Sequence, residues 1–260
     1  MEWEAPALVL SAAPYGESAL VVHVLTEAHG PYRGLVRGGG SRGQASLWQP
    51  GNLISARWFA RLSEQLGNLT AELVHPSAAR VLDHRLPLAM LSASCAVADD
   101  VLPEREPHPL VFDGLLQLLT LLSLDPAEGA RTGPASLIRW EAALLAELGY
   151  GLDLSSCAVT GTREALAFVS PRSGHAVSEA GAGIWRDRLL RMPPLLLADD
   201  DPGTISDWCD GLRLTGHFLA RDAFGQRNRP LPAARIRLLE MVQRMLPDLP
   251  EPELPESDLA

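Results

Sequence analysis

A glycine-rich loop, Gly38-Gly-Gly-Ser-Arg-Gly43, carries two patterns that could do chemistry. It matches the G-x-G-x-x-G pattern of dinucleotide-binding turns and, from Gly39 to Gly43, the G-x-S-x-G pattern of a hydrolase nucleophile elbow. Both chemistries need a loop that leads into a helix, whereas Pro50-Gly51 follows closely here. We therefore expect a flexible hairpin loop, and the neighbouring Arg37 and Arg42 favour phosphate contact as its function.

Arginine and aromatic side chains are the second source of chemistry, since rings stack on bases while Arg binds phosphates. All 22 basic residues are Arg, which excludes catalysis through a Schiff-base or P-loop lysine. Trp58 and Phe59 are adjacent in an expected strand, so they lie on opposite faces and one of them points outward. Packing in the core is the alternative for every ring. Six of the fourteen aromatic residues lie in the first 80 residues: Trp3, Tyr15, Tyr32, Trp48, Trp58 and Phe59.

Cysteine and histidine spacing predicts neither a disulfide framework nor a metal site. The three cysteines, Cys95, Cys157 and Cys209, stand alone without a C-x-x-C pair, which is typical of a reducing compartment. The seven histidines show no metal-binding spacing. No catalytic residue is therefore predicted.

Composition limits the classes of protein that the sequence can encode. With 260 residues and 47% apolar residues, the chain can bury a core, which excludes a disordered or collagen-like protein. The net charge is −10, but residues 1–80 contain six Arg and six Glu, so residues 81–260 carry the entire excess. We expect the two parts to meet different partners. The N-terminal sequence and the interrupted apolar stretch from Leu115 to Leu124 predict no signal peptide, no membrane span and a cytoplasmic location.

The first 75 residues read as short strands separated by turns. Five strands in this length predict a small closed barrel, and the OB-fold is a five-stranded barrel that binds oligonucleotides. The expected strands are Ala7–Ser11, Ser18–Leu25, Tyr32–Val36, Leu53–Phe59 and Gly67–Val74.

The pattern after Pro76 is helical, with an irregular insert between Gly151 and Gly183. The proline-rich, acidic residues 247–260 are expected to be disordered. The expected helices are Ser77–Leu102, Pro109–Leu122, Ser136–Leu148, Thr204–Phe224 and Pro232–Leu246.

Several segments, in order along nearly the whole chain, resemble the RecO family of DNA repair proteins. The longest runs from Arg139 through Trp140-Glu141 and Cys157 to Gly161. The others are Tyr15-Gly-Glu-Ser18 with Thr26 and Gly30, Gln49-Pro-Gly51, Ser170-Pro-Arg-Ser-Gly174, and Arg229-Pro-Leu-Pro-Ala-Ala-Arg-Ile-Arg-Leu-Leu239.

This resemblance implies an α+β multidomain protein. An N-terminal five-stranded OB-fold would occupy residues 1–78, an α-helical domain residues 79–152 and 184–246, a small zinc-ribbon-like insert residues 153–183, and an acidic tail residues 247–260. Many family members carry C-x-x-C twice in the insert, where this sequence has Cys157, Thr160, Ser178 and Gly181. Because one cysteine of four remains, we expect no zinc and no other cofactor.

The function implied by the resemblance is that of a recombination mediator without an enzymatic reaction. Such a protein binds single- and double-stranded DNA, anneals strands, associates with RecR and helps RecA replace the single-strand-binding protein. Family members often carry several basic residues after the V-R-G, where this chain has only Arg37 and Arg42. This departure predicts weaker DNA binding or a greater dependence on RecR.

Mediation requires one surface for phosphates and another for the acidic tail of the single-strand-binding protein. We expect the second surface on the helical domain, where Arg139 lies on a helix with an apolar side. For Arg139 the alternative is a local ion pair over the core, and for the C-terminal arginines a solvated face. The expected DNA-binding residues are Arg33, Arg37, Arg42, Arg57, Arg61 and Trp58, and the expected partner-binding residues are Arg139, Arg227 and Arg229.

Two further classes of function remain open. One is a protein-interaction adaptor whose OB-like barrel binds peptide and no DNA, and the other is a nucleotide-dependent enzyme built on the glycine loop. Salt-dependent binding of a single strand favours the mediator, whereas turnover of a nucleotide favours the enzyme.

Overall fold

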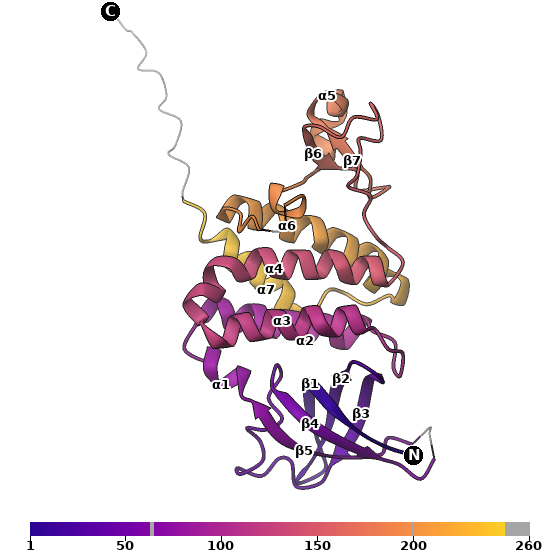
Figure 1. Cartoon of the computed structure of the whole chain (residues 1–260), viewed down its shortest axis with the longest axis vertical. Helices are drawn as coiled ribbons and strands as arrows, with labels where there is room; N and C mark the ends of the chain where they lie inside the picture. Colours follow the sequence, from indigo (N-terminus) through magenta and orange to yellow (C-terminus); the bar gives the residue numbers. More distant parts are fainter. Residues whose placement is uncertain (63–64, 199, 248–260) are drawn as a thin grey trace, which may run out of the picture.

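The N-terminal strands form a closed five-stranded sheet, as seen in the computed structural model, which describes residues 1–62, 65–198 and 200–247. Its strands follow the order β1-β2-β3-β5-β4. The five strands expected from the sequence are confirmed, and their arrangement is compatible with an OB-fold. The bounds are β1 Glu2–Tyr15, β2 Ala19–Thr26, β3 Gly30–Val36, β4 Leu53–Phe59 and β5 Asn68–His75 (Figure 1).

Strand β1 is much longer than the expected Ala7–Ser11 because it closes the sheet. Its first half, Glu2–Leu8, pairs antiparallel with β4, and its second half, from Ala7 to Tyr15, pairs with β2. The register shifts between Val9 and Ser11, as in a β-bulge. A bulge bends a strand, so β1 can serve two neighbours in turn.

The glycine loop connects β3 to β4, which are separated by β5 in the sheet. The expectation of a hairpin loop is therefore wrong, because a hairpin joins strands that pair with each other. Trp48, near the end of this connection, has its side chain buried in the barrel core. No helix follows the loop between Gly38 and β4, so the frame required by either enzymatic pattern does not occur there.

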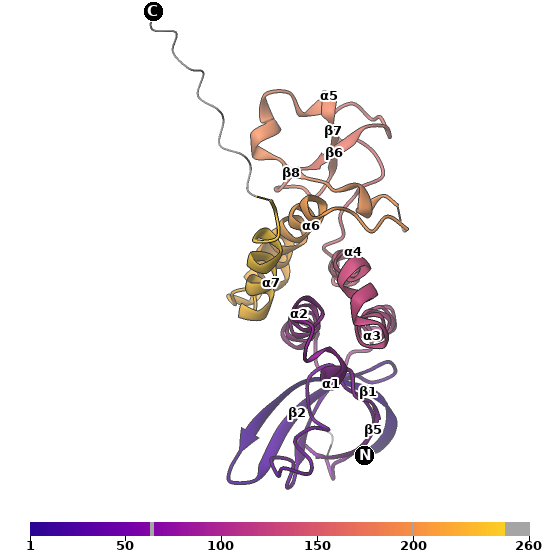
Figure 2. The same cartoon turned by 90° about the vertical axis from the view of Figure 1, so that its left-hand side faces the viewer.

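The helices form layers between the barrel and a small module at the far end (Figures 1 and 2). Helices α2 and α3 lie next to the barrel. A buried cluster of mainly Leu, Val and Ala side chains joins the helices into one core. The bounds are α1 Ser77–Val81, α2 Arg85–Val101, α3 Pro109–Leu124, α4 Pro126–Glu147, α6 Ile205–Phe218 and α7 Ala233–Gln243.

Two helices differ markedly from their expected bounds. The expected Ser77–Leu102 helix is broken between Val81 and Arg85, which places Pro87 in the first turn of α2, where its missing N–H costs nothing. Helix α4 begins at Pro126 and not at Ser136, since Asp125 caps it by accepting hydrogen bonds from the N–H groups of Ala127 and Glu128.

A buried ion pair holds α4, α6 and α7 together. The guanidinium of Arg235 in α7 donates to both carboxylate oxygens of Glu141 in α4, over 2.5 and 2.8 Å. The Thr215 hydroxyl in α6 also donates to Glu141, over 2.5 Å. Because Arg235 and Glu141 are at most 1% exposed, these bonds satisfy charges that water cannot reach.

The insert is a small module with its own sheet. Its strands are β6 Leu166–Val169, β7 Ala176–Ser178 and β8 Leu190–Arg191, in the order β7-β6-β8. The helix α5 Glu179–Ala182 and the short 3-10 helix η1 Gly183–Arg188 connect β7 to β8. The sheet thus includes residues beyond the expected range 153–183. Of the expected tail, residues 248–260 lie outside the described residues.

Among the described helices, none combines the length and apolar character needed to cross a membrane.

Candidate nucleic-acid interface

A groove at one end of the barrel brings together two of the expected DNA-binding arginines. Arg37 follows β3 and Arg61 follows β4, and both border a cavity of about 470 Å³ beside the start of β5. Within the described residues, neither arginine forms an ion pair. The residues that line this groove are Leu35, Arg37, Phe59, Ala60, Arg61, Gln65, Leu66, Gly67 and Asn68.

Phe59, and not Trp58, is the aromatic residue of this groove. In β4 the side chains alternate, so that Ile54, Ala56 and Trp58 are buried while Arg57 and Phe59 face outward. Phe59 is 47% exposed and Trp58 is 1% exposed. The expectation that Trp58 stacks on DNA is therefore wrong, because its ring lies in the barrel core.

Trp58 instead positions the groove. Its indole N–H donates to the carbonyl oxygens of Arg33 at 3.0 Å and Leu66 at 3.1 Å, which ties the end of the β4–β5 connection to β3. Gly67 lies against the same ring with a φ of +70°, and a Cβ there would come within 2.4 Å of the indole. The close approach of backbone and ring therefore requires glycine at this position.

The other expected DNA-binding arginines lie outside the groove. Arg33 pairs with Glu104 and Arg57 pairs with Glu2, so an acid partly offsets the charge of each. Arg42 is exposed in the glycine loop. The structure thus separates the five arginines into a groove pair, two ion-paired residues and one loop residue.

Arg105 is a neighbour of the groove that the sequence did not identify. Its guanidinium lies over the ring of Tyr32, 5.3 Å from the centroid, and donates to the carbonyl of Gln65 at 3.4 Å. Arg105 belongs to the α2–α3 connection and has a φ of 62°. No periodic pattern marks this connection, so only the folded chain brings the residue to the barrel.

Arg139 borders a groove of about 480 Å³ between α3 and α4, but much of its guanidinium is occupied. Nε donates to the carbonyl of Leu195 at 2.9 Å, and Nη2 donates to the carbonyls of Ala198 and Asp201 at 2.8 and 2.5 Å. The groove is lined largely by apolar side chains, including Leu118 and Leu121. Arg139 therefore fixes the segment before α6 while it stands at the edge of an apolar groove.

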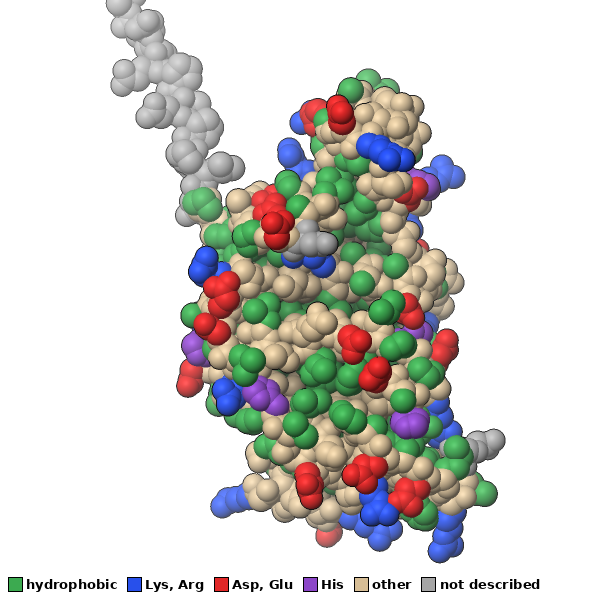
Figure 3. Space-filling model, viewed as in Figure 1, with side chains coloured by type: hydrophobic (Ala, Val, Ile, Leu, Met, Phe, Trp, Pro, Cys, Tyr) green, Lys and Arg blue, Asp and Glu red, His purple; other side chains and the backbone are tan. Residues whose placement is uncertain are grey.

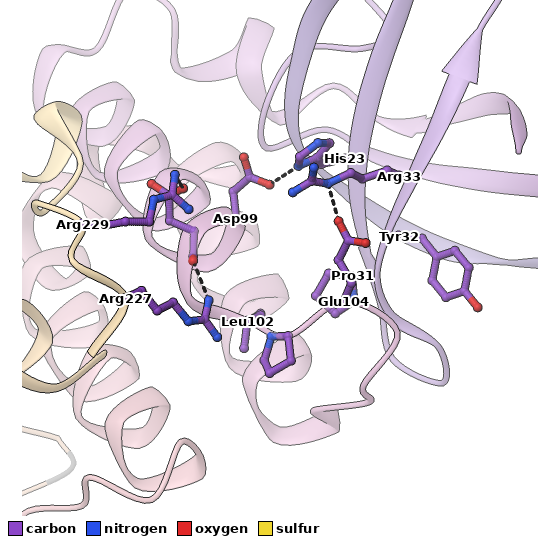
Figure 4. Close-up of a pocket in the computed structure, with 11 residues that line it drawn as sticks. His23, Pro31, Tyr32, Arg33, Asp99, Leu102, Glu104, Arg227 and Arg229 are labelled. Carbon is purple, nitrogen blue, oxygen red and sulfur yellow. Dashed lines mark hydrogen bonds and ion pairs between the residues drawn. The ribbon is translucent and has the colours of Figure 1, made fainter. Parts of the chain in front are cut away.

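Arg227 and Arg229 meet Asp100 at the junction of the barrel and the helices (Figure 4). Arg227 donates to the main-chain carbonyl of Asp100 at 2.9 Å, and Arg229 pairs with its carboxylate at 2.5 Å. The same cavity, of about 340 Å³, contains a contact of 2.6 Å between His23 of β2 and Asp99 of α2. Arg227 and Arg229 thus bind Asp100 of α2 beside the barrel, and their guanidinium groups are partly occupied by these contacts.

The four insert positions expected from the resemblance do come together. The Cys157 sulfur accepts hydrogen bonds from the Thr160 N–H at 3.4 Å and from the Ser178 hydroxyl at 3.3 Å. A Cβ on Gly181 would lie 2.9 Å from that sulfur. Burial of the thiol raises its pKa, but the hydrogen bonds from Ser178 and Thr160 outweigh burial and lower the pKa to about 6.

These residues do not fit a structural zinc ion, which takes four Cys or His ligands, because one thiol stands among a threonine, a serine and a glycine. Elsewhere in residues 1–62, 65–198 and 200–247, no group of three or more His, Cys, Asp or Glu side chains could hold a metal. A zinc-ribbon is therefore not observed. Thr160 and Ser178 donate hydrogen bonds to the Cys157 sulfur, and the Gly181 N–H donates to the Ser178 hydroxyl.

Comparison with known proteins identifies relatives over nearly the whole chain. The family model described as "Recombination protein O N terminal" matches residues 1–77, and "Recombination protein O C terminal" matches residues 85–231. The chain is 63% identical over 253 residues to the DNA repair protein RecO of Gluconacetobacter diazotrophicus, covering 97% of this chain and 100% of the relative. It is 55% identical to that of Granulibacter bethesdensis, covering 93% of this chain and 96% of the relative. The resemblance noted in the sequence is thus confirmed.

Proposed function

Because the chain belongs to the RecO family of DNA repair proteins, we propose that it is a recombination mediator that binds DNA without catalysing a reaction. In this role it binds single- and double-stranded DNA, anneals strands and works with RecR and the single-strand-binding protein to load RecA. The groove at the barrel end is the proposed DNA contact.

The observation that carries this proposal is the combination of Arg37, Arg61 and exposed Phe59 around one groove. Single-strand-binding barrels use this combination, since a ring stacks on any base while positive charges follow the phosphates. The barrel is otherwise close to neutral, with six Arg and six Glu in residues 1–80. Binding therefore depends on local charge rather than on a strongly basic domain.

The test is salt-dependent binding of a fluorescent single-stranded oligonucleotide. Replacing Arg37 and Arg61 together by Ala should weaken binding and reduce the salt slope by about 1.4, since each single-strand phosphate contact contributes about 0.7. Arg57→Ala is the control for each single variant, Arg37→Ala and Arg61→Ala, because it also removes one positive charge from the barrel, but at a residue paired with Glu2. An unchanged slope in the folded double variant would exclude the groove as the DNA contact.

The groove between α3 and α4 is the proposed site for the acidic tail of the single-strand-binding protein. An apolar groove with an arginine at its edge suits a peptide that ends in acids and an aromatic residue. Arg139→Glu should weaken binding of a labelled tail peptide by tenfold or more, and fluorescence anisotropy measures this. Since Arg139 also holds the segment before α6, Leu121→Glu at the groove, away from those carbonyls, provides a second variant.

Measurements on the same proteins distinguish the mediator from the two alternative functions, an adaptor and an enzyme. A protein that binds the tail peptide but no DNA at low salt would be an adaptor. Hydrolysis of a nucleotide would instead support the enzyme. Strand annealing on DNA coated with the single-strand-binding protein is the direct test of mediation.

A further inference from the structure

The short 3-10 helix η1, Gly183–Arg188, exposes an apolar and basic surface at the end of the molecule opposite the barrel (Figures 1 and 2). Ile184 is 91% exposed and Trp185 is 56% exposed. None of the residues of η1 is buried. Two large apolar side chains in succession are thus presented to solvent, and exposed apolar surface of this kind can serve as a binding site.

Trp185 is distinguished from the other tryptophans by its exposure. Trp48, Trp58, Trp140 and Trp208 are at most 8% exposed, and Trp3 is only partly exposed. The barrel and helices thus use their tryptophans largely for packing. The insert keeps its single tryptophan on the surface.

An arginine accompanies the exposed ring. The guanidinium of Arg188 lies over the Trp185 ring, 5.2 Å from its centroid, in a cation–π contact. Arg186, by comparison, pairs with Glu179 and lies over the Phe168 ring. Within the described residues Arg188 forms no ion pair, so its charge is available to a partner beside the ring.

The charge of the module favours an anionic partner. Residues 153–191 contain five arginines and four acids, a net charge of +1, whereas the whole chain carries −10. The space-filling view shows basic side chains together with acidic ones on this module and on the barrel, and mainly acidic and apolar side chains over the helices between them (Figure 3). The two ends are thus less acidic than the helices on this face.

We propose that the tip formed by Trp185 and Arg188 is a second contact for single-stranded DNA, in which a base stacks on the indole and Arg188 binds the adjacent phosphate. A stacked base and a phosphate are the two groups that an indole–guanidinium pair matches. The proposal rests on the proposed function, the binding of single-stranded DNA, and adds a second site for it. Contacts at opposite ends of the molecule allow one protein to hold two strand segments during annealing.

The experiment uses the intrinsic fluorescence of the full chain, since Trp185 is its one exposed tryptophan. Titration with an oligothymidine should quench or shift the emission of the wild type, and Trp185→Phe should remove this change. Trp185→Ala should weaken oligothymidine binding roughly tenfold, which is the size of one stacking contact. Arg188→Ala should weaken it as well. Arg131→Ala, which removes an exposed arginine from α4, should have no such effect.

The outcomes separate this proposal from DNA binding at the barrel. If saturating oligothymidine leaves Trp185 emission unchanged while the Arg37 and Arg61 double variant still weakens binding, the tip proposal is overturned and the barrel proposal stands. If the double variant binds normally but Trp185 emission responds, the barrel proposal fails and the tip proposal stands. A response of Trp185 to an acidic peptide but not to oligothymidine would assign the tip to a protein partner and overturn the proposal.

Discussion

At the end of β4, two adjacent aromatic residues face different surroundings, and their substitutions should therefore have different effects. Trp58→Phe removes the hydrogen bonds to the carbonyls of Arg33 and Leu66, so we expect a loss of about 1–3 kcal/mol in the free energy of unfolding. Phe59→Ala should leave stability within about 1 kcal/mol, since this ring is 47% exposed, but weaken oligonucleotide binding. Urea denaturation and anisotropy of the two variants test this division. A Phe59 variant that binds normally would contradict it.

Alternation along the strand predicted that one of these two residues points outward, but the choice of Trp58 as the DNA-binding residue was wrong. Alternation along a strand is a local property, whereas the choice of inner face depends on long-range pairing. Trp58 is opposite Trp3 of β1 and Leu69 of β5, and the closure of the sheet places these residues inside. The same limit applies to Arg105, which reaches the barrel from a connection between two helices.

The insert cysteine provides a second prediction at the scale of single residues. Because Ser178 and Thr160 donate hydrogen bonds to the sulfur, the Cys157 thiol should ionise with a pKa of about 6. Ser178→Ala should raise that pKa, and Cys157→Ser should remove the transition. Thiolate absorbance as a function of pH measures both. Metal analysis of the purified protein accompanies it, and about one zinc per chain would contradict the expectation that four ligands are required.

Among the helices, the buried pair of Glu141 and Arg235 connects two segments that the sequence analysis noted only for their resemblance. Glu141→Ala leaves the Arg235 guanidinium buried without its carboxylate, so we expect a loss of about 3–5 kcal/mol in unfolding free energy. Glu128→Ala, which removes the exposed partner of Arg131 on the same helix, should cost at most about 1 kcal/mol. Equal losses of unfolding free energy for the two variants in chemical denaturation would show that the buried pair contributes no more to stability than the exposed one.

Helix bounds could be predicted where hydrophobic periodicity and capping residues agree. The prediction was wrong where glycine and proline are packed inside a helix. The capping box of Thr204 and Asp207 was visible in the sequence and precedes α6. The expected helix began at Ser136, after Gly133 and Pro134, yet both residues are buried within α4. A Cβ on Gly133 would come within 2.8 Å of the Leu122 side chain, so a larger residue there would force that side chain of α3 to shift.

At the scale of the whole molecule, acidic side chains of the helical part contact histidine and arginine side chains of the barrel. His23 and Arg33 of the barrel pair with Asp99 of α2 and with Glu104 just beyond it, and Arg229 approaches Asp100 from the C-terminal segment (Figure 4). The composition predicted two parts of different net charge, but it did not predict which side chains pair between them. Pairing across the junction depends on residues far apart in sequence, which no local pattern contains.

A histidine at the same junction predicts how stability depends on pH. His75 ends β5 and its Nε2 lies 3.0 Å from the Ser123 hydroxyl of α3, which itself donates to the Leu119 carbonyl. Nε2 therefore carries the proton that Ser123 accepts, and a second proton would bind Nδ1. Burial, with the charge of Arg80 as a smaller cause, lowers the pKa of His75.

The folded protein consequently keeps His75 neutral at pH values where an unfolded histidine, with a pKa of about 6.5, becomes protonated. Its contribution to stability should be complete above this pH and decrease as the pH falls from about 6.5 toward the lower pKa of the folded state. Chemical denaturation between pH 5 and 8 should thus give a steeper loss of stability for the wild type than for His75→Gln, which cannot titrate. Parallel profiles would mean that His75 titrates alike in both states, because the difference between the two proteins isolates this one side chain.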